Sequence, residues 1–250
     1  MPRILVTNDD GVHSSGIKAL VDALSPLADV CAVAPMTEAS ASGHALTLRR
    51  PLRIDNFSKN WFGVDGTPTD CVNLAVSHVL DGLPDLVVSG INAGSNLGDD
   101  VTYSGTVAGA LEGLLLGIPS LAISQERSDA NIDFSQAAMI AKQLSELVLL
   151  NGLPPRTFLN VNVPSKKALG VKVTIQSQRN HKASVVKCFD PHQKPYYWID
   201  EAILDWEVHD QSDYQVLKDG WVSVTPLQSD WTAQKSISLV EDLALKIKLS

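Results

Sequence analysis

Short apolar runs alternate with helical patterns along the first two thirds of the chain, and this alternation restricts the fold more than any other feature. Buried strands are expected at residues 3–7, 29–34, 85–89, 120–124 and 158–163, with alternating, strand-like stretches around residues 45–54 and 61–64. Helices are expected at residues 16–24, at residues 71–80 with their start at residues 67–70, and at residues 105–116 and 134–150. The first crossover is too long for a hairpin but suits parallel strands. We therefore expect an α/β fold with a doubly wound, mostly parallel, Rossmann-like sheet.

The pattern changes after residue 165. Strands are expected at residues 171–176, 196–199 and 221–225, separated by polar stretches without clear helices, which indicates a β-hairpin that leaves the main body. The tail at residues 236–250 fits both a strand and a helix, and its apolar side chains need cover from a partner subunit or from their own chain. We expect residues 1–165 to form the Rossmann-like catalytic core and residues 166–250 to form a β-rich part that completes it.

Charge and cysteine content restrict the partners. The net charge is −8, which disfavours DNA or RNA as a partner, whereas a small anion can bind where a metal ion or N–H donors reverse the local field. Cys31, Cys71 and Cys188 are odd in number and form no CxxC pair, as in proteins of a reducing cytoplasm. The N-terminal apolar run is too short for a signal peptide, and no stretch is long enough for a membrane helix. We expect a cytoplasmic protein that contacts neither nucleic-acid polymers nor membranes.

Two adjacent acids, Asp9 and Asp10, follow the first expected strand in the motif Asn-Asp-Asp-Gly. Ligands of open α/β sheets bind beyond such strand ends. Neighbouring carboxylates repel each other unless a cation or proton offsets the repulsion, and Gly11 lets the chain turn there. Mg²⁺ and Mn²⁺ prefer such oxygen ligands. The alternative is a turn whose acids cap the next helix, but the position at a strand end favours a metal site. A dinucleotide site is disfavoured, because acids occupy the place of its glycine-rich loop.

Polar loops follow other expected strands. In the glycine- and asparagine-rich residues 89–98, Asn92 can offer an oxygen to a metal and Asn96 can donate its amide hydrogens to a phosphate. The turn Ser104-Gly105-Thr106 begins a helix, where free N–H groups and the helix dipole favour anions. Each feature also has a structural explanation, namely a glycine-rich connection for the first and an ordinary N-cap for the second. Together they predict a phosphate cradle beside the metal.

The loop after the second expected strand offers Ser40, Ser42 and His44 as polar contacts, although nothing intrinsic identifies Ser40 as a ligand. His13 and His44 are the nearest candidates for a general base, and sequence alone does not decide between them. Because each of these loops follows a strand of one parallel sheet, all can converge on one edge. Such a site polarises a phosphoryl group and activates water.

Two other protein classes also carry acids at this position. A haloacid-dehalogenase-type phosphatase uses an aspartyl nucleophile in an Asp-x-Asp pattern, whereas the acids here are adjacent and Asn8 takes the first position. A receiver-type signalling module, which is not an enzyme, needs a phosphoacceptor Asp after a later strand, and the corresponding strand here ends in Ser89-Gly90. Metal-activated water is therefore the favoured mechanism, with phosphate removed from a small phosphorylated molecule.

Several motifs occur in an order that resembles the SurE survival-protein family: ILVTNDDGVHSSG (residues 4–16), VAPMTEASASGH (33–44), GTPTDC (66–71), VSGINAGSNLG (88–98) and SGTVAGALEG (104–113). The family comprises metal-dependent 5′/3′-nucleotidases that hydrolyse nucleoside monophosphates. The resemblance runs from the N-terminus to at least residue 124. Residues 180–219 match poorly, and Ala39 and Ala93 stand where polar or longer residues are expected.

The resemblance implies a role for each matching residue. The metal ligands would be Asp9, Asp10, Ser40 and Asn92, and Asn96, Ser104, Gly105 and Thr106 would hold the phosphate. The expected catalytic residues are accordingly Asp9, Asp10, Asn96, Ser104 and Thr106. It also implies one divalent cation per subunit, Mg²⁺ or Mn²⁺, a cytoplasmic location and a homodimer or homotetramer assembled through the C-terminal part.

Overall fold

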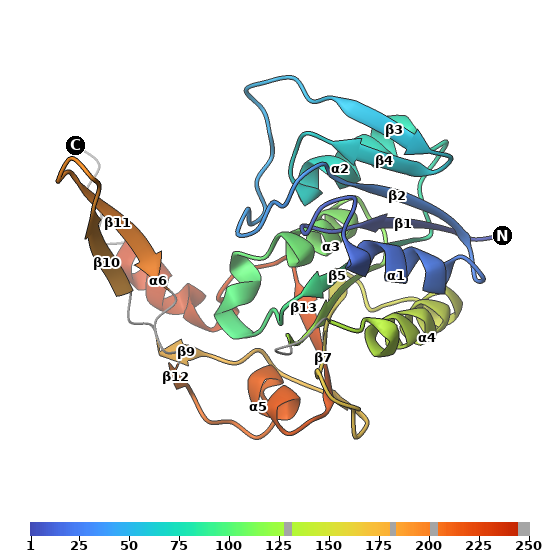
Figure 1. The fold of residues 1–250 in the computed structure, drawn as a ribbon. Coiled ribbons are helices and arrows are strands. Elements are labelled where there is room, and N and C mark those ends of the chain that lie inside the picture. Colours follow the sequence, from blue (N-terminus) through green and yellow to red (C-terminus); the bar gives the residue numbers. More distant parts are fainter. Residues whose placement is uncertain (128–131, 181–183, 201–204, 245–250) are drawn as a thin grey trace.

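The computed structural model describes residues 1–127, 132–180, 184–200 and 205–244. Its centre is a nine-stranded sheet in the order β3-β4-β2-β1-β5-β6-β7-β13-β8 (Figure 1). The pairs are parallel except β3 on β4 and β13 on β7. The strands are β1 (Arg3–Thr7), β2 (Asp29–Pro35), β3 (Ile54–Ser58), β4 (Trp61–Val64), β5 (Leu86–Ala93), β6 (Ser120–Gln125), β7 (Thr157–Val163), β8 (Val171–Val173) and β13 (Val222–Gln228). The predicted doubly wound, mostly parallel α/β fold is confirmed.

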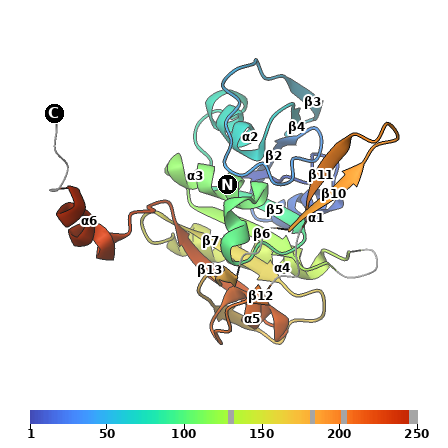
Figure 2. The ribbon, with the colours of Figure 1, turned by 90° about the vertical axis from the view of Figure 1, so that its left-hand side faces the viewer.

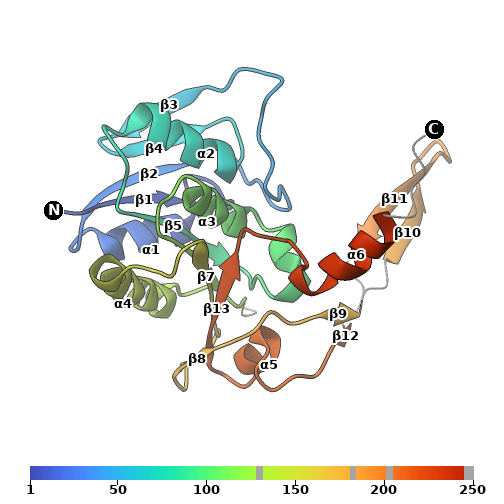
Figure 3. The same ribbon diagram turned by 180° about the vertical axis from the view of Figure 1, so that it is seen from behind.

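Helices cover both faces of the sheet because its central strands are apolar on both sides. Side chains alternate across a strand, so Ile4 and Val6 of β1 face one layer and Leu5 the other, all three fully buried. Ile4 and Val6 belong to the core beneath α1 (Ser15–Leu24) and α4 (Ser135–Asn151). Leu5 belongs to the core beneath α2 (Pro68–Leu74), beside which α3 (Gly105–Leu115) packs. Figures 1 and 3 show the two helical layers from opposite sides.

The order of strands places a topological switch point at β1. From β1 the chain builds outward through β2 and β4, and it then crosses back to add β5, β6 and β7 on the other side. The crevice beyond the carboxyl ends of β1 and β5 is where open α/β sheets bind ligands. Asp9 and Asp10 follow β1, and Asn92 lies near the end of β5. The switch point therefore brings together the loop that carries Asp9 and Asp10 and the loop that carries Asn92.

Some local predictions need correction. Residues 45–53 form no strand, because side-chain oxygens take their backbone donors: Thr47 N donates to Asp70 Oδ1 (2.8 Å) and Arg53 N to Asp65 Oδ1 (2.7 Å). The helix start expected at residues 67–70 is confirmed, with a capping box formed by Thr67 and Asp70, but the helix continues as a π-helical turn, Ala75–Val79. The strand expected at residues 171–176 ends at Val173.

The C-terminal part returns to the sheet and also leaves it. β13 pairs with β7, and the short helix α5 (Asp213–Lys218), which was not expected, precedes it with Ser212 as N-cap. The predicted hairpin is confirmed as β10 (Ser184–Phe189) paired with β11 (Pro195–Asp200), although β10 was not expected. At its base, β9 (Arg179–Asn180) pairs with β12 (Asp205–Trp206). The division of the chain at residue 165 stays a prediction.

The hairpin and the last helix project from the body as two extensions. The ambiguous tail forms a 3₁₀ turn, Gln234–Ser236, and helix α6 (Ile237–Ala244), and residues 245–250 lie outside the described residues. Figure 1 shows the hairpin and α6 on the same side of the body, and in Figure 2, which looks at that side, the two diverge from each other. Exposed apolar side chains lie on the hairpin, including Phe189, Tyr197 and Trp198. Of the helices in the described ranges, none is long and apolar enough to cross a membrane.

Candidate active site

Asp9 is the most buried acid of the predicted site, at 5% exposure. Its carboxylate accepts hydrogen bonds from both donors of Thr106, the backbone N–H (3.0 Å) and the hydroxyl. Burial raises the pKa of Asp9 above its ordinary value, and the charge of Asp10 raises it further, whereas the Thr106 hydrogen bonds lower it. Thr106 therefore orients Asp9, which differs from the phosphate contact that the sequence predicts for it.

Gly105 allows the first turn of α3 to lie directly against Asp9. A Cβ at this position would stand 2.8 Å from Asp9 Cβ and 2.9 Å from Ser42 Oγ, closer than real Cβ atoms approach. The buried Ser42 hydroxyl has no hydrogen-bond partner in the part of the chain that the structure describes. The loop after β2, the end of β1 and the start of α3 thus meet at one point, with a polar atom available for a ligand.

Asp10 is half-buried and bonded to β5. Its Oδ2 accepts a hydrogen bond from Ala93 N (3.0 Å), which places Asp10 beside the strand end that carries Asn92. Burial is the main cause that raises the pKa of Asp10, with a smaller contribution from Glu38, whereas the Ala93 N–H and Arg127 lower it. Asn92 donates through Nδ2 to Gly94 O (2.7 Å), so its Oδ1 remains as a side-chain acceptor.

Ser40 lies in a loop that is attached to Asp9, although its own hydroxyl points to a neighbour. Ala39 N donates to Asp9 O (2.8 Å), which holds this loop at the site. The Ser40 side chain is exposed, and its hydroxyl donates to Glu38 Oε1 (2.6 Å). The backbone before Ser40 is therefore held against Asp9, but the Ser40 hydroxyl forms its hydrogen bond with Glu38 and not with Asp9 or Asp10.

Asn96 and Ser104 lie in the other two predicted segments. The Asn96 amide donates to Ser124 Oγ (2.8 Å), which leaves its second amide hydrogen for another acceptor. Its backbone is held on both sides, because Asn162 Oδ1 accepts from Asn96 N (2.8 Å) and Asn160 donates to Asn96 O (2.9 Å). Ser104 is the N-cap of α3, because its hydroxyl oxygen accepts a hydrogen bond from Val107 N (3.1 Å). This is the ordinary N-cap that was the alternative to a phosphate contact. Neither contact involves Asp9, so the phosphate roles of both residues stay predictions.

Sequence reasoning missed the residues that hold these loops. Asn160 and Asn162 are fully buried polar residues at alternate positions of an apolar strand, and this unusual pattern is a signal for a structural role. The buried carboxylate of Asp213 accepts hydrogen bonds from Gly98 N (2.9 Å) and Ser177 N (3.0 Å), which ties the loop of Asn96 to the C-terminal part. No local pattern marks Asp213 for this role, because its partners are distant in sequence.

The two candidate histidines lie in different environments. His13 is exposed, and its ring makes a T-shaped contact with the ring of Phe57 on β3, with 4.8 Å between centroids. His44 Nε2 lies 2.6 Å from Glu112 Oε2 on α3. Neither contact involves the acids that follow β1. The structure thus separates the two, and only His44 contacts the helix that begins at the predicted phosphate turn.

The residues present fit a hard divalent cation. Two acids whose pKa values are raised by burial gain stability from a cation, and the Asn92 oxygen and the serine hydroxyls are further oxygen donors. Within the described ranges, no three or more His, Cys, Asp and Glu side chains gather as a metal site. A ligand set of two acids, one amide and one hydroxyl is consistent with this finding, because it contains only two such side chains.

Comparisons with known proteins point to one family. The model of the family "Survival protein SurE" matches residues 4–183. The 5′-nucleotidase SurE of Syntrophotalea carbinolica is 50% identical over 234 residues, which cover 93% of this chain and 94% of that protein. The 5′-nucleotidase SurE of Geotalea daltonii is 48% identical over 242 residues, 96% of this chain and 98% of that protein.

A solved structure agrees with this match. The crystal structure of the SurE protein from Aquifex aeolicus superposes with a TM-score of 0.86 at 43% identity, and the match covers 97% of this chain and 100% of that chain. Family, fold and sequence motifs therefore lead to the same conclusion: the chain belongs to the SurE survival-protein family.

Proposed function

We propose that this protein is a metal-dependent nucleotidase that hydrolyses nucleoside 5′- and 3′-monophosphates to nucleoside and phosphate. One observation carries the proposal: Asp9 and Asp10 lie at the switch point of the sheet, and Asp9 is hydrogen-bonded to the first turn of α3. Cation ligands and an anion-binding helix terminus are thereby adjacent. The 5′-nucleotidase names of the related proteins support the same substrate class.

Asp9, Asp10, Asn92 and Ser40 are the residues that would hold the cation. Thr106 keeps the Asp9 carboxylate in one orientation through two hydrogen bonds, and Ala93 N does the same for Asp10. When bound, the cation supplies Lewis acidity that polarises the phosphoryl group and activates the attacking water. For Ser40, this role requires its hydroxyl to exchange Glu38 for the cation.

The phosphate would be held by the first turn of α3 and by Asn96. Ser104 and Gly105 stand at the positive end of the helix dipole. Ser104 N donates to Asp100 O (3.2 Å), and Thr106 N donates to Asp9. The backbone donor of this turn that would serve a phosphate is therefore Gly105 N. The Asn96 amide keeps one hydrogen for a phosphate oxygen after its bond to Ser124. In a protein with a net charge of −8, such local donors are needed to attract a dianion.

Neither alternative mechanism is favoured. An aspartyl nucleophile of the haloacid-dehalogenase type belongs to an Asp-x-Asp pattern, whereas Asp9 and Asp10 are adjacent and Asn8 takes the first position. A receiver module needs an acid as phosphoacceptor at the end of a later strand, and β5 ends in Asn92 and Ala93. The match to the SurE family extends over most of the chain and agrees with neither class.

The finer features of the function are part of the same proposal. One Mg²⁺ or Mn²⁺ ion per subunit suits the set of oxygen ligands. A homodimer or homotetramer assembled through residues 166–250 would cover the exposed apolar side chains of the hairpin, such as Phe189 and Trp198. The cytoplasm suits a chain whose three cysteines are free thiols, of which Cys31 and Cys71 are buried.

The test is phosphate release from AMP and from 3′-AMP by the purified protein with Mn²⁺, before and after EDTA. We expect release from both substrates, loss with EDTA and recovery with excess Mn²⁺. Asp22→Asn is a matched control, because Asp22 is an exposed acid paired with Lys18 and its loss should leave turnover unchanged. Release that persists in EDTA, or a covalent aspartyl-phosphate trapped with labelled substrate, would refute the proposal.

A further inference from the structure

A buried carboxylate on α3 holds His44 in a fixed orientation. Glu112 is 6% exposed, and its Oε2 lies 2.6 Å from His44 Nε2. Its other oxygen accepts a hydrogen bond from Asn73 Nδ2 on α2 (2.6 Å). With Nε2 bonded to Glu112, the second ring nitrogen, Nδ1, is left for another partner. The His44 side chain is 32% exposed, so a ligand can reach it.

Packing alone does not explain Glu112. A charged side chain is rarely this buried, since its desolvation destabilises the fold unless the charge is well paired. Leucine at this position would fill the same helix face without that penalty. A carboxylate that orients the ring of a histidine is, by contrast, a common arrangement where the other ring nitrogen has a chemical role.

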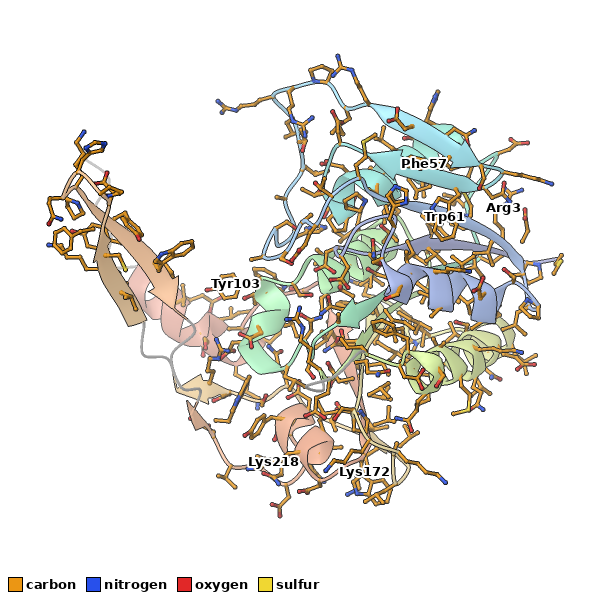
Figure 4. All side chains as sticks on the ribbon, viewed as in Figure 1. Arg3, Phe57, Trp61, Tyr103, Lys172 and Lys218 are labelled. Atoms are coloured by element: carbon orange, nitrogen blue, oxygen red, sulfur yellow. The ribbon has the colours of Figure 1, made fainter. Side chains whose placement is uncertain are left out.

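The loop that carries His44 is attached to the predicted phosphate turn. Gly43 N donates to Tyr103 O (3.0 Å), and Ser42 Oγ lies 2.9 Å from the position of a Cβ on Gly105. Figure 4 labels Tyr103, which follows the 3₁₀ turn Gly98–Thr102 that leads into α3. His44 and Ser104 line the same cavity of about 630 Å³, whose size suits a small organic ligand. His44 therefore shares this cavity with the residue that begins the predicted phosphate turn.

One other charged side chain lines this cavity among the described residues. Asp230 is exposed and accepts a hydrogen bond from Thr232 N (2.9 Å), and Thr232 lowers the pKa of Asp230 below its ordinary value. Asp230 is therefore a carboxylate near neutral pH and has no proton to give. Among the described lining residues, His44 is the side chain of the type that most often serves as a general acid.

We propose that His44 is the general acid that protonates the nucleoside oxygen as it leaves, and that Glu112 is its positioning residue. The proposal rests on the nucleotidase function above. A nucleoside alkoxide is a strongly basic leaving group, so a proton donor at this oxygen accelerates the reaction. The cavity beyond Ser104 would receive the nucleoside, which places its ester oxygen at the edge where His44 lies.

The step balances without a further reactant. The oxygen of water bonds to phosphorus while the bond between phosphorus and the nucleoside oxygen breaks, and the electron pair of that bond stays on the nucleoside oxygen. The Nδ1 proton of the imidazolium moves to this oxygen and gives a hydroxyl group. One proton of the attacking water afterwards returns to the imidazole, and the other leaves with the phosphate product.

The test compares leaving groups rather than a single rate. Wild-type protein, His44→Gln and Glu112→Gln are assayed with Mn²⁺ on AMP and on a series of aryl phosphates from phenyl to 4-nitrophenyl phosphate. In His44→Gln, we expect kcat for AMP to fall about 100-fold, in the range of general acid catalysis. The loss should shrink steadily as the leaving group becomes the stronger acid, so the plot of log kcat against leaving-group acidity becomes steeper. Glu112→Gln should show a smaller change in the same direction.

Controls separate this proposal from simpler roles. His13→Gln replaces the exposed histidine that contacts Phe57 and should keep the wild-type slope. If His44 only contacts the nucleoside, the variant raises KM without changing the slope; if it is a general base or only structural, all substrates slow equally. Either result overturns the proposal. A wild-type protein that does not release phosphate from AMP refutes the nucleotidase function instead.

Discussion

Replacing Asp9 with asparagine separates metal binding from folding. The carboxylate of Asp9 is 5% exposed and receives both donors of Thr106. In Asp9→Asn, the amide oxygen can still accept from Thr106 N, and the amide group can donate to the Thr106 hydroxyl, which is also an acceptor. The shape is retained, so the packing against Gly105 does not change. The substitution removes one charge and little else.

The expected change in stability follows from two opposing effects. Loss of charge assistance weakens two hydrogen bonds by about 1 kcal/mol each. Removal of a buried charge and of its repulsion from Asp10 stabilises the metal-free protein by a similar amount. The free energy of unfolding without metal should thus change by less than about 1 kcal/mol, or roughly 2–4 °C in Tm for a chain of this size. By contrast, a cation at roughly 100 times its Kd stabilises the wild type by about 2.7 kcal/mol.

The assay is thermal unfolding of both proteins in EDTA and in Mn²⁺, alongside AMP turnover. The wild-type Tm should rise roughly 5–10 °C with Mn²⁺, whereas the variant should show almost no rise and no measurable turnover. In EDTA, the raised pKa of Asp9 means that the folded protein binds more protons than the unfolded chain. The contribution of Asp9 to the free energy of unfolding therefore falls as pH rises above 3.8. Asp9→Asn should not show this pH-dependent loss of stability. A variant that keeps the wild-type metal response, or near-wild-type turnover at saturating Mn²⁺, refutes the assignment.

Two further predictions concern the surroundings of the site. In Gly105→Ala, the new Cβ would stand 2.8 Å from Asp9 Cβ. We expect turnover to fall at least about 10-fold and the Mn²⁺ concentration for half-maximal activity to rise. A metal titration with an unchanged midpoint contradicts this reasoning. In Asn162→Asp, a carboxylate oxygen replaces the amide group that donates to Asn96 O. The free energy of unfolding, measured with urea, should fall by about 1–3 kcal/mol, and the KM for AMP should rise. An unchanged KM shows that the position of Asn96 does not matter for substrate binding.

The fold was predictable because its signals are local. Apolar runs of strand length, the acids after β1 and the serine before α3 each report on neighbouring residues, and the rule that parallel strands end at one edge assembles them. The errors also have local causes. Residues 45–53 alternate like a strand, but the side chains of Asp65 and Asp70 take their backbone donors. The tail carries two periodicities at once, and only packing decides between them.

The sequence indicates candidate members of the site but not the contacts between them. Asp9 and Thr106 are 97 residues apart, and no sequence pattern indicates that both donors of Thr106 serve that carboxylate. The same holds for Glu112 and His44, which are 68 residues apart. Such pairings depend on how α3 lies on the sheet, which in turn depends on close approach at glycines such as Gly105. Single residues report their chemistry, whereas their partners follow from the three-dimensional arrangement.

The pairing of β9 with β12 closes the base of the hairpin, so a different hairpin can replace it without a change in the rest of the chain. Arg179 pairs with Trp206 there, so the chain departs and comes back at adjacent positions. Arg179 also donates a hydrogen bond to Asp100 Oδ2 (2.8 Å), which attaches the base of the hairpin to the side of the molecule that carries the predicted site. Insertions, deletions or a different hairpin beyond this base can therefore accumulate without moving the residues of that site. The hairpin and the rest of the chain can therefore evolve separately, because the two paired positions of β9 and β12 hold the ends of the hairpin segment together.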